Sequence, residues 1–149
     1  MSNIKLLVTG ASSQVGSALC ARALKAGMSV VWFDESILSS LRLETIQEAV
    51  ASYKPDYVVN TASYSVVDLV QDNPEKSHLI NHDMAFLLAQ ACDALDLPLL
   101  HLSTDYVFDG TQTTPYKEDA YTSPVNRFGE AKLAAEKAIR QVCAKHIIL

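Results

Sequence analysis

The sequence predicts an α/β fold: a Rossmann-like, doubly wound parallel sheet that ends inside about the fifth strand. Two observations support this. Short apolar segments alternate with amphipathic helical patterns along the whole chain, and a glycine-containing turn, TGASSQVG at 9–16, joins the first strand to the first helix. The apolar segments are almost continuously hydrophobic, as expected for strands of a parallel sheet covered by helices on both faces.

The expected strands are short and buried. They are residues 4–9 (IKLLVT), 29–33 (SVVWF), 57–61 (YVVNT), 99–103 (LLHLS) and the segment that begins at 146 (HIIL). Pro55 with Asp56, and Pro98, stand just before the third and fourth strands, where they end the preceding helical patterns.

The expected helices lie between these strands. They are residues 14–26, closed by Gly27; residues 43–53; residues 74–95, started by Asn73-Pro74 and interrupted near Asn81; and a last helix after the polar loop 105–123. In the last of these, Ser123 is the expected N-cap and Pro124 the expected first helical residue.

Length and composition narrow the class of protein. A chain of 149 residues with 49% hydrophobic and 19% charged residues fits one globular domain. The net charge of −5 argues against a nucleic-acid or anionic-membrane partner, and no apolar run approaches the roughly 20 residues that span a bilayer. The N-terminus lacks a signal-peptide layout, and the three cysteines are far apart, so we expect buried thiols in the reducing cytoplasm.

The turn after the first strand has the features of a dinucleotide site. Gly10 allows a tight turn, Gly16 allows close helix packing, and Ser13 stands where the fingerprint has its middle glycine. The N-terminus of the following helix offers free N–H groups to a pyrophosphate. The alternative is an ordinary strand-to-helix turn.

Asp34 ends the second strand, 18 residues after Gly16. A carboxylate there can accept hydrogen bonds from the adenosine ribose, and it would repel a 2′-phosphate. NAD(H) is therefore favoured and NADP(H) is second. The alternative is a solvated loop acid.

The ends of the later strands carry further polar groups. Small residues follow the third strand in NTASYS, 60–65, where a cofactor could lie against the backbone, and the fourth strand ends in HLSTDYVFDG, 101–110, which presents Thr104 and Asp105 at the same edge. On the last helix, Phe128 and Lys132 are four residues apart and share a face, as in a Tyr-x-x-x-Lys pair with Phe in place of Tyr. Without its neighbours, Phe128 would be taken for a core aromatic.

Four segments, VNTASYSVVD, LSTDYVFDGT, PYKEDAYTSPVN and FGEAKLAAEKA, together resemble the dTDP-4-dehydrorhamnose reductase family of extended short-chain dehydrogenase/reductases. The resemblance implies an oxidoreductase of dTDP-rhamnose biosynthesis that reduces a 4-keto nucleotide sugar with NAD(P)H. By the same resemblance, Thr104 bonds the sugar carbonyl, Asp105 lies beside the substrate, and Lys132 binds the nicotinamide ribose. The resemblance also assigns the pyrophosphate to Ser13, Gln14 and Val15, and the cofactor lining to Ala62, Ser63, Tyr64 and Ser65.

Three departures from the family pattern qualify this expectation. Phe128 replaces the proton-donating Tyr, Ala131 replaces a small hydroxyl residue, and the family continues for roughly as many residues again. We therefore expect residues 1–149 to form the NAD(P)-binding domain, with the substrate-binding lobe absent from this chain. Loss of the acid should impair the reaction by about 10²–10⁴-fold. The alternative is a non-catalytic NAD(P)- or nucleotide-sugar-binding or regulatory protein on the same fold.

Two further expectations concern metals and association. The spacing of His78, His82, His101 and His146 predicts no metal site. If residues 1–149 are the whole chain, no helix follows the last strand to cover its face. The strand should then either pair with another copy, as in a homo-oligomer, or expose apolar surface around Ile147, Ile148 and Leu149.

Overall fold

The computed structural model describes residues 4–33, 35–66, 70 and 72–149. It contains a sheet of five parallel strands in the order β2-β1-β3-β4-β5. The strands are β1 (Lys5–Thr9), β2 (Ser29–Trp32), β3 (Tyr57–Asn60), β4 (Leu99–His101) and β5 (His146–Ile148). The predicted Rossmann-like sheet is confirmed, with each strand where the sequence predicts it.

The helices also follow the predicted alternation. They are α1 (Gln14–Lys25), α2 (Glu35–Ser39), α3 (Leu43–Tyr53), α5 (Pro74–His78), the π-helix η1 (Leu79–Asp83), α6 (Met84–Ala94), the short 3-10 helix η2 (Asp105–Val107) and α7 (Arg127–Val142). The interruption expected near Asn81 is the π-helix η1, whereas α2 is an addition that the sequence interpretation lacked.

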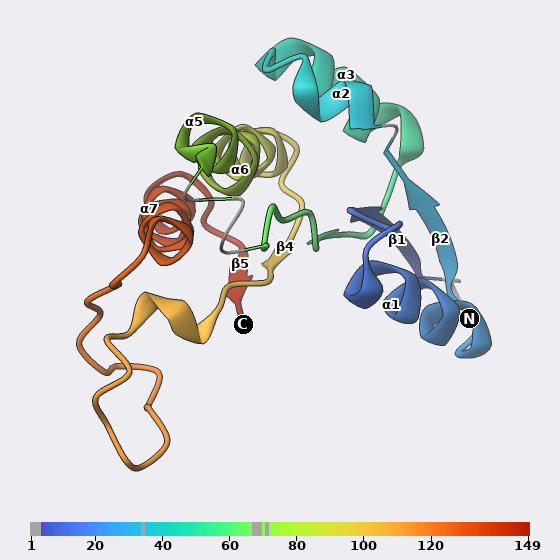
Figure 1. Ribbon diagram of the computed structural model, residues 1–149. Helices are drawn as coiled ribbons and strands as arrows, with labels where there is room; N and C mark the ends of the chain where they lie inside the picture. Colours follow the sequence, from blue (N-terminus) through green and yellow to red (C-terminus); the bar gives the residue numbers. More distant parts are fainter. Residues whose placement is uncertain (1–3, 34, 67–69, 71) are drawn as a thin grey trace.

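The sheet separates two layers of helices (Figure 1). On one face, Ala23 and Leu19 of α1 pack on Leu6, Val8 and Val59 of the strands. The opposite face carries the larger core, to which α3, α6 and α7 contribute. Its fully buried members include Leu7, Ile46, Val50, Val58, Leu88, Leu99, Ala135 and Ile139.

The α1 face is only partly covered over β3, β4 and β5. An apolar groove of about 620 Å³ runs along it, lined by side chains that include Val59, Leu100, Leu102, Ile147 and Leu149. Ile147 and Leu149 are more than half exposed. The expected association of copies through this part of the chain stays a prediction.

The start of α7 differs from the expectation. Asn126, not Ser123, is the N-cap: its Oδ1 accepts a hydrogen bond of 2.8 Å from the Gly129 N–H. Ser123 instead donates its backbone N–H to the carbonyl of Val107. This bond ties the segment around Ser123 and Pro124 to η2, so the chain turns into the helix three residues later than predicted.

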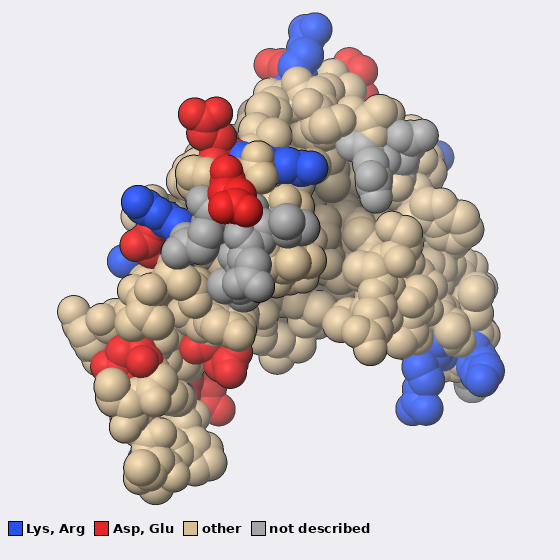
Figure 2. Space-filling view, in the orientation of Figure 1, with Lys and Arg blue, Asp and Glu red and all other residues tan. Residues whose placement is uncertain are grey.

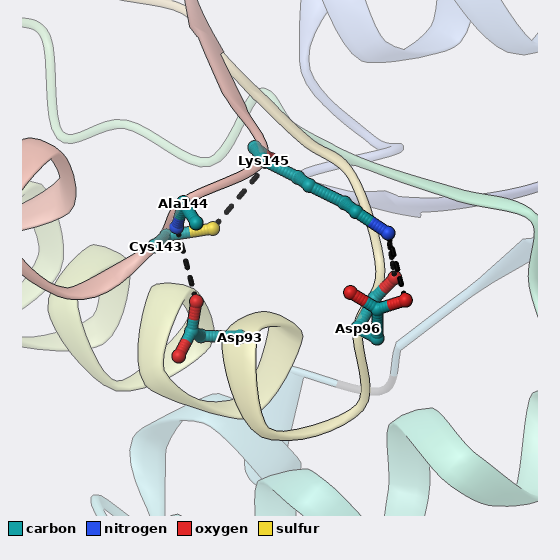
Figure 3. Close-up of polar contacts among 5 residues, drawn as sticks. All are labelled: Asp93, Asp96, Cys143, Ala144 and Lys145. Atoms are coloured by element: carbon teal, nitrogen blue, oxygen red, sulfur yellow. Dashed lines mark hydrogen bonds and ion pairs between the residues drawn. The ribbon is translucent and has the colours of Figure 1, made fainter.

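The entry into β5 is fixed by the end of α6 (Figure 3). The backbone N–H of Ala144 donates to Asp93 Oδ1 over 3.0 Å, and Lys145 Nζ lies 2.7 Å from Asp96 Oδ2. Cys143, at the C-cap of α7, is buried beside them. The strand is thereby held in register next to β4.

Cysteine burial follows the prediction for Cys92 and Cys143, while Cys20 is only partly covered. Within the described ranges, no helix has both the length and the apolar composition to cross a bilayer.

Candidate cofactor and active site

The β1–α1 turn has the compact geometry that a phosphate site requires. Ser13 is the N-cap of α1, and its Oγ accepts a hydrogen bond of 3.0 Å from the Gly16 N–H. Gly10 has φ of +67°, and a Cβ at this position would lie 2.6 Å from the backbone nitrogen of Ala62. A Cβ on Gly16 would lie 2.1 Å from the Gly10 carbonyl oxygen. Both glycines are therefore required for the close approach of the turn to β3.

A cleft of about 640 Å³ opens above this turn, at the carboxyl ends of the strands. It brings together Gly10, Ser12, Ser13, Phe33, Ala62 and Ser63, together with residues of α2, α5, η1 and α6. Figure 2 shows this face hollowed between the helices α5 and α6 on one side and β1 and α1 on the other. Gln14 and Val15 are exposed on the first turn of α1. Asp34 lies outside the described residues.

Asn81 holds the segment that follows β3. This buried side chain accepts a 2.9 Å hydrogen bond from the Tyr64 N–H, and its Nδ2 donates to the Tyr64 carbonyl and to Ser77 Oγ. Ser63 Oγ also donates to Asn81 Oδ1. The sequence interpretation missed this role, although an Asn inside an apolar helical stripe was a usable signal.

Thr104 and Asp105 lie at the other half of the site. Thr104 Oγ1 accepts a hydrogen bond from the Tyr106 N–H and donates to Asp105 Oδ1 over 3.2 Å, which starts η2. Both residues line a separate cleft of about 660 Å³, together with Tyr116 and Glu136. The residues that line this cleft do not include those of the glycine turn, so the structure places the two groups of predicted site residues in different hollows.

Phe128 is buried where α7 meets η2. Its ring packs edge-on against Tyr106, with ring centroids 5.8 Å apart. The next residue, Gly129, lies so close to η2 that a Cβ there would be 2.1 Å from the Tyr106 carbonyl oxygen. The contact fixes the N-terminal turn of α7 against the segment that carries Thr104.

Lys132 lies one turn further along α7 and points into the protein. The residue is only 2% exposed, and its Nζ donates to the carbonyl of Leu102 and lies 3.1 Å from His101 Nε2. Burial lowers the pKa of Lys132 to about 8, against a smaller raising effect of the Glu136 carboxylate. Burial, and then the charge of Lys132, lower the pKa of His101 to about 3, so the imidazole is neutral at ordinary pH.

His101 belongs to a row of polar residues that the sequence interpretation did not connect. Thr9, Asn60 and His101 are register partners on β1, β3 and β4. Thr9 Oγ1 donates to Asn60 Oδ1 over 2.6 Å, and Asn60 Nδ2 lies 3.0 Å from His101 Nδ1. Polar residues at the last positions of three adjacent apolar strands were the signal that could have found this row.

A known protein family matches almost the whole chain. The family described as "RmlD substrate binding domain" matches residues 4–149. The chain belongs to this family.

Two curated relatives are dTDP-4-dehydrorhamnose reductases. The protein of Escherichia coli (strain K12) is 37% identical over 149 residues, covering 97% of this chain and 50% of the relative. That of Burkholderia thailandensis is 40% identical over 138 residues, covering 93% of this chain and 46% of the relative. The chain thus spans about half the length of the curated relatives it matches.

Solved structures of dTDP-4-dehydrorhamnose reductases have the same fold. The Bacillus anthracis protein, in complex with NADP, superposes with a TM-score of 0.92 at 26% identity over 99% of this chain and 53% of that one. The Clostridium acetobutylicum protein gives a TM-score of 0.90 at 27% identity over 97% of this chain and 52% of that one.

A cluster of three possible metal-binding side chains lines neither of the two clefts described above. His78, His82 and Asp83 bring their ligand atoms within 4.8 Å of one another, through an i, i+4 spacing that the sequence interpretation overlooked. His82 Nδ1 is already 2.7 Å from Asp83 Oδ1, and His78 is largely exposed. This pairing needs no metal, and the expectation of no metal site stays a prediction.

The buried lysine predicts a pH-dependent stability. Below about pH 8, Lys132 is charged in both the folded and the unfolded chain, so folding bears the full cost of burying the charge. Between about pH 8 and its unfolded value of 10.5, the unfolded chain binds more protons at this residue, so stability should rise with pH. Urea unfolding across this range should show the wild type gaining free energy of unfolding relative to Lys132→Met. A difference between the two proteins that does not change with pH would contradict the burial of a charged lysine.

Proposed function

We propose that this chain is the NAD(P)-binding half of a reductase of 4-keto nucleotide sugars of the dTDP-4-dehydrorhamnose reductase type, with impaired catalysis. The observation that carries the proposal is the β1–α1 turn. Its glycines pack against the end of β3, and Gly10 and Ser13 line, together with Ala62 and Ser63, the cleft at the carboxyl ends of β1 and β3. In open parallel sheets this is where dinucleotides bind.

The proposed cofactor contacts follow from this cleft. Ser13, Gln14 and Val15 would hold the pyrophosphate at the start of α1, where the helix dipole favours negative charge. The Ser13 N–H already donates to the Gly10 carbonyl, so the backbone N–H groups of Gln14 and Val15 would be the donors. Ala62, Ser63, Tyr64 and Ser65 would lie along the rest of the cofactor, in the segment that Asn81 holds. The relative of known structure that was solved with NADP supports the nicotinamide class of cofactor. The preference for NAD(H) rests on Asp34 alone.

The catalytic proposal uses the other end of the site. NAD(P)H, when bound, supplies a hydride for the sugar carbonyl. Thr104 would donate a hydrogen bond to that carbonyl oxygen, Asp105 would contact the sugar, and Lys132 would contact the nicotinamide ribose. In the present structure the Lys132 amine is bonded inside the protein, so this role requires the side chain to leave His101 and Leu102. The substrate-binding lobe would come from residues outside 1–149.

Phe128 is the reason to expect weak catalysis. A phenyl ring has no proton to give to the developing alkoxide, and neither a threonine hydroxyl nor a buried lysine replaces a matched acid. This observation also favours a second candidate function, in which the chain binds a dinucleotide or nucleotide sugar without turning it over. Copies of the chain could pair through β5 in either case.

Calorimetric titration of the chain tests the cofactor proposal. NADH should bind more tightly than NADPH, because the 2′-phosphate would meet the Asp34 carboxylate. Asp34→Asn should reduce the preference by about tenfold, equivalent to ~1.4 kcal/mol. Circular dichroism serves as the folding control for both proteins. Tighter binding of NADPH by the wild type would remove the role given to Asp34, and a folded chain that binds neither nucleotide would refute the cofactor site.

Catalysis is tested in a chimera in which residues 1–149 replace the matched half of the Escherichia coli reductase. With the wild-type residues, oxidation of NADH by dTDP-4-dehydrorhamnose should be slow. Phe128→Tyr adds a hydroxyl on the helix face of Lys132 and should raise turnover by about 10²-fold or more, the scale of a positioned general acid.

Tyr106→Phe is the matched control for this experiment, because Tyr106 is the phenol in ring contact with Phe128. If the wild-type chimera turns over at an ordinary rate, another acid operates and our interpretation of Phe128 is wrong. Loss of that rate in Tyr106→Phe would identify Tyr106 as the acid. If Phe128→Tyr binds both ligands but stays inactive, the binding function is favoured.

A further inference from the structure

A buried chain of hydrogen bonds connects α7 to the cofactor cleft. It runs from Lys132 Nζ to His101 Nε2 (3.1 Å), from His101 Nδ1 to Asn60 Nδ2 (3.0 Å), and from Asn60 Oδ1 to the backbone N–H of Ala62 (3.1 Å). Lys132, His101 and Asn60 are each at most 4% exposed. Ala62 lines the cleft beside Gly10.

The pattern of donors and acceptors along this chain differs between the neutral and the charged lysine. The Ala62 N–H can only donate, so it fixes Asn60 Oδ1 on its side and turns Asn60 Nδ2, also a donor, toward His101. His101 Nδ1 must then accept, which leaves the single proton of the neutral ring on Nε2. That N–H points at Lys132 Nζ, which can accept it only through the lone pair of an uncharged amine.

A charged lysine demands the opposite arrangement. An ammonium group can only donate, so His101 Nε2 would have to accept and the ring proton would move to Nδ1. Asn60 would then present Oδ1 to His101 and its amide nitrogen to Ala62. The Ala62 N–H would face another donor and lose its hydrogen bond within the protein. In this change the lysine gains one proton from solvent while the imidazole remains neutral, with its proton exchanged from one nitrogen to the other.

We propose that His101 and Asn60 are positioning residues that couple the charge of Lys132 to the hydrogen-bonding state of the Ala62 N–H. With Lys132 neutral, the N–H is satisfied by Asn60. With Lys132 charged, it is free to donate to an acceptor in the cleft.

The other charged groups around Lys132 act on its charge electrostatically and are not members of this hydrogen-bond chain. Glu136, one turn further along α7, raises the lysine pKa and is held by a hydrogen bond from Ser103 Oγ on the segment after β4. From α5 and η1, Glu75, His78 and Asp83 border a groove on α7 beside Arg127 and Glu130. Among the described residues, His101 is thus the titratable group in direct contact with the lysine amine.

Nitrogen NMR of histidine-labelled wild-type chain tests the coupling without any substitution. His101 should carry its proton on Nδ1 at pH 6.5, where Lys132 is charged, and on Nε2 at pH 10, where it is neutral. The amide exchange of Ala62, corrected for intrinsic pH dependence, should be faster in the charged state. One tautomer at both pH values, or an Ala62 amide that is insensitive to the lysine titration, would overturn the proposal.

Two variants separate the hydrogen-bond chain from simple charge effects. In Asn60→Asp, a carboxylate can accept hydrogen bonds from His101 and from Ala62 at once. The His101 ring should therefore stay in the Nδ1–H form at both pH values. The pKa of Lys132 should rise by about one unit or more, which is a tenfold gain in proton affinity. Glu136→Gln should lower the lysine pKa but leave the tautomer switch intact. A switch that persists in Asn60→Asp would contradict the proposed route.

A consequence for binding rests on the proposed function. A dinucleotide that accepts a hydrogen bond from Ala62 should favour the charged lysine, so bound NADH should raise the pKa of Lys132, and NADH affinity should fall as pH rises through that value. A chain that shows the tautomer switch but binds no dinucleotide would retain the coupling and refute the cofactor proposal. Bound NADH with an unchanged lysine pKa would contradict the link between the switch and the cleft.

Discussion

The hydrogen-bond chain from Thr9 through Asn60 and His101 to Lys132 is the constraint on which the rest of this site depends. It crosses the three central strands and ends on α7, so it fixes the carboxyl edge of the sheet from inside. Burying these groups is costly unless each is paired. Among the described residues, every buried side-chain nitrogen and oxygen has a hydrogen-bond partner. The pairing holds β1, β3, β4 and α7 in one arrangement.

This arrangement explains why the two ends of the site differ in character. At the β1 and β3 ends, two glycines allow the turn to approach the next strand closely, and Asn81 fixes the segment beyond it. At the β4 end, α7 packs on η2 through Phe128 and Tyr106, with no phenol at position 128. One end thus has a close glycine turn and the other a buried phenyl ring at position 128, which is why the proposed binding and the proposed catalysis must be tested separately.

Much of this could be predicted from the sequence because local patterns determine it. Apolar strands, the glycine turn and the helix 43–53 follow from periodicity and turn chemistry, and the structure confirms them. The start of α7 was misplaced because Asn126 caps the helix, while a long-range bond from the Ser123 N–H to the Val107 carbonyl holds the preceding segment against η2. The inward direction of Lys132 and its contact with His101 depend on packing across 31 residues, which no local pattern encodes.

A double-mutant cycle between Asn60→Ala and Lys132→Met tests the central constraint most directly. These residues lie on different elements and are connected through His101, so their effects on the free energy of unfolding in urea should not add. The predicted coupling is about 1 kcal/mol or more, as found for groups in one hydrogen-bond network. Effects that add to within ~0.3 kcal/mol would show that the chain of contacts does not act as a unit and would contradict the account.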